Sequence, residues 1–351
     1  MSEIARRVGV SRAAVSAVLN PNYKTIKISP ETRAKIQKVL DTTQYVPNAI
    51  GQSLKSRRTG HIGFILADTI ADGWSNAYFA KILSGVETIC HQRGYSLNIS
   101  RYNLSNIDSF VFPKRVGQRS MDGLVLAGGL IQAAVVDRFK TFGIPCVCVG
   151  DDLEVAEMIP TISCDMVGAL LQCVAHAAER GHWRIAFCVQ ATRRSREVAG
   201  QLVARARALY GSGACEIALM TTPGEADYSA GGPLVDQWAS LAEDRRATCL
   251  VGNDQVMVSA LKELSRRGFR CPRDVGLIST VDSKLCEYSD PGLTSSRPDL
   301  AKLGETAAGL LIDHLEEGMD LSPKMSRNDF PVSFVVRESC NLWPGKTDGE
   351  G

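Results

Sequence analysis

Residues 4–20 read IARRVGVSRAAVSAVLN, and this stretch indicates two short helices separated by a tight turn. Apolar residues recur at helical spacing in residues 2–8 and again in residues 12–19. Gly9 ends the first helix, and Ser11 is a cap residue for the second. Two helices joined by a short turn with glycine are typical of a helix-turn-helix, although other helical hairpins share the pattern.

A third helix completes a small all-α head. Ser29-Pro30-Glu31 supplies a cap residue, a proline at the first helical position and an acid near the positive end of the helix dipole. Ile36, Val39 and Leu40 then form the inner face of this helix. Pro47-Asn48 begins a shorter helix, residues 49–56, which leads to a basic tract.

The basic residues gather in this N-terminal part. Residues 1–60 contain 11 Lys and Arg against three acids, which gives a net charge of +8, and the remainder of the chain carries −6. A basic head on an acidic body indicates that the head, and not the body, meets a polyanion.

From Ile62 onward, short apolar runs alternate with amphipathic helical patterns. This alternation predicts βαβ units and parallel sheets. The expected strands are 62–67, 96–100, 123–127, 146–150, 161–163, 185–189, 248–252, 275–280 and 332–336, and the clearest helices are 77–93, 168–180, 254–267 and 300–317.

Several classes of protein are disfavoured. No apolar run reaches the roughly 18–20 residues that cross a bilayer, and the N-terminus has no apolar signal segment, so we expect a cytoplasmic protein without a membrane partner. Because Met1 lies inside the first helical turn without a cap residue, we also expect a start a few residues upstream. The nucleotide, hydrolase and zinc-protease sequence signatures are missing, which disfavours an enzyme.

The 11 cysteines form no Cys-x-x-Cys pair, and we interpret them as buried thiols in a reducing compartment, with a redox-sensing pair as the alternative. His176 and His182 are too far apart in sequence to share a helical face, so we expect no metal site and no cofactor.

Three segments carry a resemblance to a known family: residues 6–20, 29–33 and 45–54, the last reading YVPNAIGQSL. They resemble the lactose-repressor (LacI/GalR) family of transcription regulators, and the similarity continues to about residue 340. The resemblance implies a helix-turn-helix domain (1–45), a hinge helix and linker (46–60) and a periplasmic-binding-protein-like α/β body (61–340). Lobe one of the body would take about 61–160 and 293–322, and lobe two about 161–290 and 323–340, with a disordered tail at 341–351.

The family's DNA contacts carry over to particular residues of this chain. The second helix would enter the major groove, where Arg12 can form a bidentate contact with guanine. Leu54 of the hinge would wedge between base pairs in the minor groove. The full set implied for DNA is Ser11, Arg12, Ala13, Ser16, Asn20, Lys24, Asn48, Leu54 and Lys55.

A small-molecule effector is expected between the lobes, at the carboxyl ends of the strands. Carboxylates there can accept hydrogen bonds from hydroxyls, aromatic rings can stack on a sugar, and an arginine can donate. The implied residues are Trp74, Asn76, Phe79, Asp165, Arg196, Asp254 and Asp282. For Asp254, capping of the following helix is the structural alternative.

The sequence also departs from the family. Ala14, Ala17, Gly51 and Gln52 replace usual DNA-contacting or hinge residues, so the operator sequence does not follow by analogy. Met166 follows Asp165 where Asn is usual, and Glu197 stands where an arginine is usual, which leaves the effector's identity open.

We therefore expect a repressor that binds a pseudo-palindromic operator as a homodimer, controlled by a carbohydrate-like effector. Two alternatives remain, a DNA-binding regulator with a ligand-independent body and, more remotely, a periplasmic-type sugar-binding protein.

Overall fold

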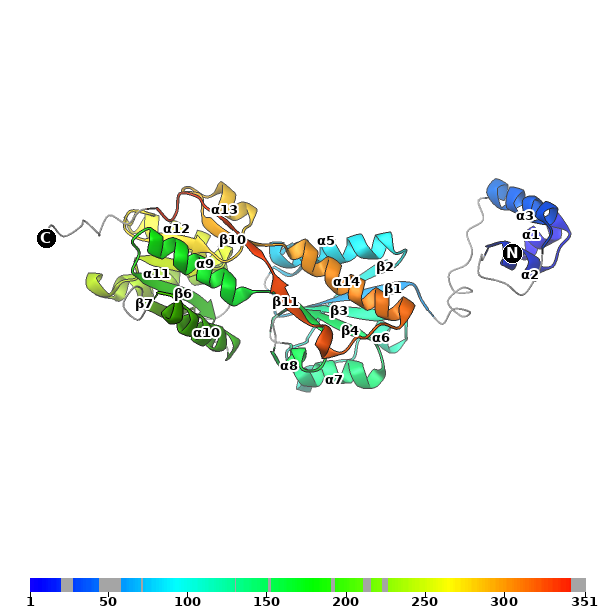
Figure 1. Cartoon of the computed structure of the whole chain (residues 1–351), viewed down its shortest axis with the longest axis horizontal. Helices are drawn as coiled ribbons and strands as arrows, with labels where there is room; N and C mark the ends of the chain where they lie inside the picture. Colours follow the sequence, from blue (N-terminus) through cyan, green and yellow to red (C-terminus); the bar gives the residue numbers. More distant parts are fainter. Residues whose placement is uncertain are drawn as a thin grey trace. The chain divides into compact units, whose positions relative to one another are not determined.

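The computed structural model describes residues 1–19, 28–43, 58–70, 72–129, 131–150, 153–190, 193–210, 216–222 and 227–341. The chain divides into two compact units, Met1–Gly60 and His61–Gly351 (Figure 1). The expected hinge helix at 49–56, the loop at 20–27 and the tail from 342 onward lie outside the described residues.

The N-terminal unit contains the three predicted helices, α1 (Ser2–Val8), α2 (Arg12–Leu19) and α3 (Pro30–Thr43). Gly9 ends α1 in the left-handed conformation (φ 76°), which costs glycine little. The Ser11 hydroxyl accepts a hydrogen bond from the Ala14 N–H (3.1 Å), and Ser29 caps α3 through the Thr32 N–H (3.2 Å). Both predicted caps are confirmed. One apolar cluster holds the helices together, with Ile4, Ala5, Val15, Val18, Ile36 and Leu40 buried.

The second unit contains two six-stranded sheets, each at the centre of a lobe (Figure 1). The first sheet has the order β11-β5-β4-β3-β1-β2. Its strands are β1 (His61–Ala67), β2 (Ser96–Tyr102), β3 (Gly123–Ala127), β4 (Cys146–Val149), β5 (Thr161–Cys164) and β11 (Arg327–Phe330). All of its strand pairs are parallel.

The second sheet has the order β12-β10-β9-β8-β6-β7. Its strands are β6 (Arg184–Gln190), β7 (Glu216–Thr222), β8 (Cys249–Gly252), β9 (Gly276–Ser279), β10 (Thr294–Pro298) and β12 (Val332–Val335). Its pairs are parallel except for β10 with β12. The predicted α/β body with parallel sheets is confirmed.

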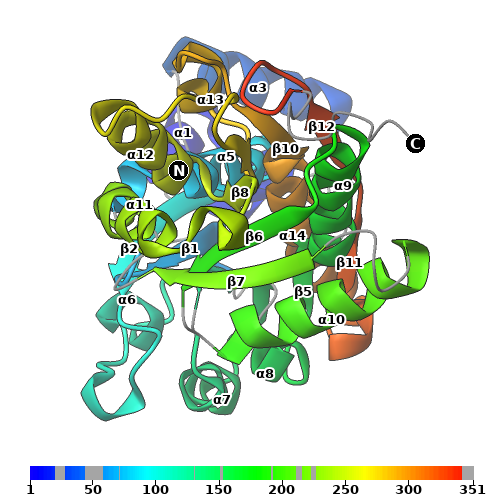
Figure 2. The same ribbon diagram turned by 90° about the vertical axis from the view of Figure 1, so that its left-hand side faces the viewer.

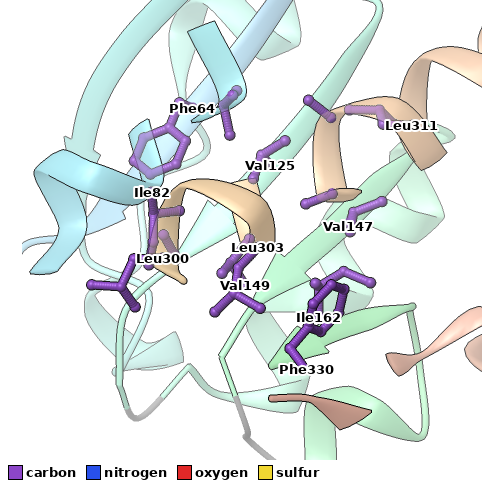
Figure 3. Packing of buried hydrophobic residues seen from close by; sticks show 14 of the residues in the cluster. Phe64, Ile82, Val125, Val147, Val149, Ile162, Leu300, Leu303, Leu311 and Phe330 are labelled. Atoms are coloured by element: carbon purple, nitrogen blue, oxygen red, sulfur yellow. The ribbon is translucent and has the colours of Figure 1, made fainter. Parts of the chain in front are cut away.

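Helices cover both faces of each sheet because successive strand residues point to opposite sides. In β1, Phe64 packs against α5 (Ala77–Gln92) and α14 (Leu300–Glu317), whereas Ile65 belongs to the cluster that contains α7 (Ala133–Phe142). Figure 3 shows the first of these cores, where Phe64, Val125 and Val147 of the sheet face Ile82, Leu303 and Leu311. Short helices α6 (Lys114–Gly117) and α8 (Leu153–Ala156) add to the α7 side.

The second sheet repeats this arrangement. Ala186 of β6 packs with α11 (Gly231–Ser240) and α12 (Asp254–Arg266), and Phe187 packs with α9 (Met166–Glu179) and α10 (Arg193–Tyr210). Figure 2 shows these two helix pairs on opposite sides of β6 and β7. A short helix, α13 (Lys284–Tyr288), and the 3₁₀ turns Gly73–Ser75, Ile107–Ser109, Tyr228–Ala230, Glu243–Arg245 and Pro323–Met325 complete the body.

The backbones of α5 and α14 touch directly, and glycine is the reason. A Cβ atom on Gly85 would overlap the carbonyl of Ala301, and a Cβ on Gly304 would overlap the carbonyl of Ile82. Each helix thus presents a position without a side chain to the other.

Three strands near the crossings between the lobes belong to the other lobe than the sequence analysis expected. β5 begins at Thr161 yet belongs to the first sheet, β10 belongs to the second sheet although 293–322 was expected in lobe one, and β11 returns to the first sheet. The strands β7, β10 and β11 were not predicted. β10 and β11 read TSSRP and RNDF, and hydrogen bonding rather than an apolar pattern holds such polar strands in place.

Candidate functional site

The second helix of the N-terminal unit presents an exposed cation at its start. Arg12 is the first residue of α2 and is exposed, as are Ser11 and Ala13, while Ser16 is half-buried. Among the residues that the structure describes, no carboxylate lies within salt-bridge distance of Arg12. Its guanidinium therefore stays available to an external acceptor.

The other two arginines of this region are engaged locally. Glu3 accepts from Arg6 Nη2 (2.8 Å) and Arg7 Nε (3.0 Å). Hydrogen bonds from Arg7 and then Arg6 lower the pKa of Glu3 below its usual value. The remaining residues implied for DNA, namely Asn20, Lys24, Asn48, Leu54 and Lys55, lie outside the described residues.

A cavity of about 560 Å³ lies between the two lobes of the body. The first lobe contributes the segment after β1, including Asp72 and Asn76, and the start of α5, including Phe79. The second lobe contributes the ends of its strands and the start of α12. Its lining comprises Thr69, Ile70, Asp72, Ser75, Asn76, Ala77, Tyr78, Phe79, Gly129, Gln190, Tyr228, Asn253, Asp254, Gln255, Val281 and Leu285.

The chemistry of this lining is polar and acidic. Two carboxylates and several amides and hydroxyls face the cavity together with aromatic rings, and no Lys or Arg belongs to the described lining. Asn253 caps α12 through the Val256 N–H (2.8 Å), so Asp254, at the first helical position, does not serve as the cap. Because the described part of the lining holds carboxylates and no cation, it fits a neutral molecule rich in hydroxyls better than an anion.

Three of the seven implied effector residues meet in this cavity: Asn76, Phe79 and Asp254. Trp74 instead packs on Phe64 in the first core, with ring centroids 6.1 Å apart. Asp165 caps α9 through the Gly168 N–H (2.9 Å), and Arg196 is exposed on α10; neither belongs to the cavity lining.

Asp282 is buried and belongs to a charged cluster rather than to the cavity lining. Its carboxylate accepts hydrogen bonds from Ser295 Oγ (2.6 Å) and Arg297 Nε (2.7 Å) and pairs with Arg337 Nη1 at 2.8 Å. Burial alone would raise the pKa of Asp282, but the hydrogen bonds from Ser295, Arg337 and Arg297 outweigh it, and the pKa lies below the usual 3.8. The arrangement fixes β10 to the segment after β12.

Sequence reasoning missed Tyr228, Gln190 and Gln255, which line the cavity. Tyr228 lies on the 3₁₀ turn that directly precedes α11, where an aromatic residue carries no signal by itself. Burial, followed by the nearby carboxylates of Asp254 and Asp72, raises the pKa of Tyr228, so its phenol keeps its proton and can donate.

Neither a membrane span nor a metal centre is found among the residues that the structure describes. No helix within them is long and apolar enough to cross a membrane. No group of three or more His, Cys, Asp or Glu side chains in the same ranges is arranged to hold a metal ion.

Comparisons with known proteins agree with this architecture. The model of bacterial regulatory proteins of the lacI family matches residues 1–48, and that of the periplasmic binding protein-like domain matches residues 174–340. Catabolite control protein A of Priestia megaterium is 26% identical over 316 residues, which cover 90% of this chain and 92% of that protein.

Two solved structures share the fold. The lac repressor dimer bound to operator and the anti-inducer ONPF has a TM-score of 0.75 at 19% identity, covering 96% of this chain and 98% of that one. The complex of the transcriptional regulator CelR with cellobiose has a TM-score of 0.65 at 22% identity, with coverage of 96% and 98%. The chain belongs to the lacI family of bacterial regulatory proteins and is a transcription regulator with a helix-turn-helix DNA-binding domain.

Proposed function

We propose that this regulator is a repressor that binds a pseudo-palindromic operator as a homodimer. A neutral, carbohydrate-like effector in the interlobe cavity controls the repressor's affinity for that operator. The proposal keeps the division into a head (1–45), a hinge (46–60) and a body (61–340). The polar lining of the cavity is the observation that supports the effector class, and the exposed start of α2 is the observation that supports DNA binding.

On the DNA side, α2 lies in the major groove with Arg12 on the base edges. A guanidinium without an internal carboxylate partner can form two parallel hydrogen bonds to guanine O6 and N7. Ala13 beside it offers only apolar contact, as to a thymine methyl. Ser11 accepts a bond from its own helix and still has its hydroxyl hydrogen for a phosphate.

Phosphate contacts fix the register of the head without reading sequence. Ser16, Asn20, Lys24, Asn48 and Lys55 have this role in the proposal, and Leu54 wedges into the minor groove from the hinge. Two heads would occupy half-sites about one helical turn apart. The structure of the lac repressor dimer bound to its operator supports this arrangement by analogy.

On the effector side, the charge of the cavity decides the ligand class. Asp254 and Asp72 accept hydrogen bonds from hydroxyls, while Gln190 and Gln255 can both donate and accept. Phe79 and Tyr228 offer ring faces to the apolar side of a sugar. A phosphorylated sugar or a nucleotide would meet two carboxylates and, among the lining residues that the structure describes, no balancing cation. The complex of CelR with cellobiose, a neutral sugar, supports this ligand class by analogy.

Control follows because both lobes line the cavity. A ligand that contacts both favours one lobe arrangement, and a difference of about 1–3 kcal/mol between the two arrangements is typical of such coupling. None of the described lining residues is Trp74, Asp165, Arg196 or Asp282, so these four have no contact with the effector in this proposal.

The test is selection of genomic fragments by the purified protein, with and without added neutral sugars, and with sugar phosphates as the matched anionic set. A short pseudo-palindrome whose recovery changes with a neutral sugar is the expected result. Recovery that responds to no small molecule would favour a ligand-independent regulator, and a response confined to sugar phosphates would overturn the ligand class.

A further inference from the structure

A second, apolar pocket of about 240 Å³ adjoins the interlobe cavity inside the second lobe. α9, α10 and the strands β6 to β8 enclose it, with Leu170, Phe187, Val198 and Leu202 among the lining side chains. These four side chains are at most 8% exposed, so the pocket penetrates the layer between the helices and the sheet.

The two spaces share part of their walls. Gln190, at the end of β6, and Asn253, just after β8, line both the cavity and the pocket. These amides and Thr280 give the pocket a polar margin, whereas its other lining residues are apolar apart from Cys188. Burial raises the pKa of Cys188 to about 12, so this thiol is neutral as well.

We propose that the effector is amphipathic: a hydroxylated head occupies the interlobe cavity, and an apolar substituent, of the kind found in aryl glycosides, enters the pocket beside α10. The inference rests on the proposed function, because it extends the same effector from one space into the next. An engineered apolar cavity of about 150 Å³ is known to hold benzene, so the pocket has room for one aromatic ring.

The substituent, rather than a separate apolar ligand, is the better occupant for a physical reason. A head held in the cavity brings its substituent to the pocket without a second loss of translational freedom. A ring that enters the pocket loses its contact with water against the side chains of α9 and α10.

The experiment titrates the full-length protein with pairs of methyl and phenyl glycosides of several neutral sugars by calorimetry. For the sugar that binds, the phenyl glycoside should bind at least about tenfold more tightly than the methyl glycoside. The test variant is Ala199→Leu, which adds three carbons inside the pocket. The matched control is Ala204→Leu, the same change at an exposed position of the same helix.

Ala199→Leu should remove the phenyl preference and leave the methyl glycoside's affinity unchanged, while Ala204→Leu keeps both. A second variant, Leu202→Ala, should favour a naphthyl over a phenyl glycoside, with exposed Leu209→Ala as its control.

Equal binding of methyl and phenyl glycosides, or a phenyl preference that survives Ala199→Leu, overturns the apolar subsite and leaves the proposed function intact. Binding of phenol that Ala199→Leu abolishes, without any phenyl glycoside preference, overturns the link between the two spaces. If no neutral glycoside binds, the proposed effector class and the inference fall together.

Discussion

Gln255, in the first turn of α12, donates a hydrogen bond from Nε2 to Asp72 Oδ2 at 2.9 Å, and this bond joins the two lobes across the cavity. Asp72 adopts a left-handed conformation (φ 61°) between β1 and α5. A second contact between the lobes runs from Lys81 Nζ to the carbonyl of Asp282 at 3.2 Å. These two hydrogen bonds therefore link side chains of the first lobe to the second lobe.

Removing the Gln255–Asp72 hydrogen bond should increase local opening of the segment around Asp72 in the first lobe. In Gln255→Ala, hydrogen exchange of peptides spanning residues 68–80 should rise by up to about tenfold, since one hydrogen bond contributes about 0.5–1.5 kcal/mol. Asp72→Asn is the control, because Asn tolerates positive φ and keeps an acceptor oxygen. Equal exchange in Gln255→Ala and the parent would show that the bond does not hold the lobes.

The α5–α14 crossing should tolerate no side chain at its glycines. Gly85→Ala forces a methyl group into the carbonyl of Ala301 and should lower the free energy of unfolding by about 1–3 kcal/mol, measured by urea denaturation. Gly309→Ala on α14 meets nothing within 4 Å and should stabilise by up to about 1 kcal/mol through helix propensity. Similar effects of the two changes would argue against the close crossing.

Loss of the Asp282 carboxylate should be severe. Asp282→Asn leaves the Arg337 guanidinium, whose side chain is 15% exposed, without its ion-pair partner. Breaking a buried pair from one side typically costs about 3–5 kcal/mol, so the urea midpoint should fall markedly. Asp329→Asn, which removes an exposed pair with Arg327, should leave the midpoint where it is. A mild effect of Asp282→Asn would mean that Ser295 and water compensate.

The Asp282 carboxylate should also make the protein less stable in acid. Because the pKa of Asp282 is lower in the folded protein than in the unfolded chain, its contribution is complete above about pH 4 and is lost as the pH falls through the folded pKa. Urea midpoints between pH 3 and pH 6 should therefore decline more steeply for the parent than for Asp282→Asn. Parallel curves would exclude Asp282 as a source of the acid sensitivity.

Substitutions in the N-terminal part should distinguish residues that read bases from residues that bind phosphates. Arg12→Ala should relax the operator preference by about 1–3 kcal/mol at one base pair, whereas Lys55→Ala should weaken binding to all sequences and reduce its salt dependence. Arg6→Ala is the comparison, because Arg6 is engaged by Glu3. Binding profiles over an operator library at two salt concentrations make the distinction. If Arg12→Ala retained the parent's sequence preference, α2 would not read bases through this residue.

Local sequence patterns were enough to predict many of the helix ends and strands of this protein. The caps at Ser11 and Ser29, the left-handed Gly9 and the apolar runs of β1 and β3 depend on residues a few positions apart, and the structure has them where the sequence predicts them. Asn76, Phe79 and Asp254 were also identified as candidates and do line one cavity, because strand and helix ends of a parallel sheet meet at the same edge.

Contacts between residues that are distant in sequence determine the remaining features, which are the ion pairs and the full lining of the cavity. Asp282 was expected to meet a ligand, but Arg297 of β10 and Arg337, just after β12, surround its carboxylate, and only the fold brings them beside it. Tyr228 and Gln255 reach the cavity because α11 and α12 pack on the second sheet; Gln255 follows the candidate Asp254, but neither residue carries a signal of its own in the sequence. Chain-local patterns determine helices, strands and caps, since those depend on neighbouring dihedrals. Which side chains share a cavity or an ion pair depends on strand order and on lobe packing, and these belong to the tertiary structure alone.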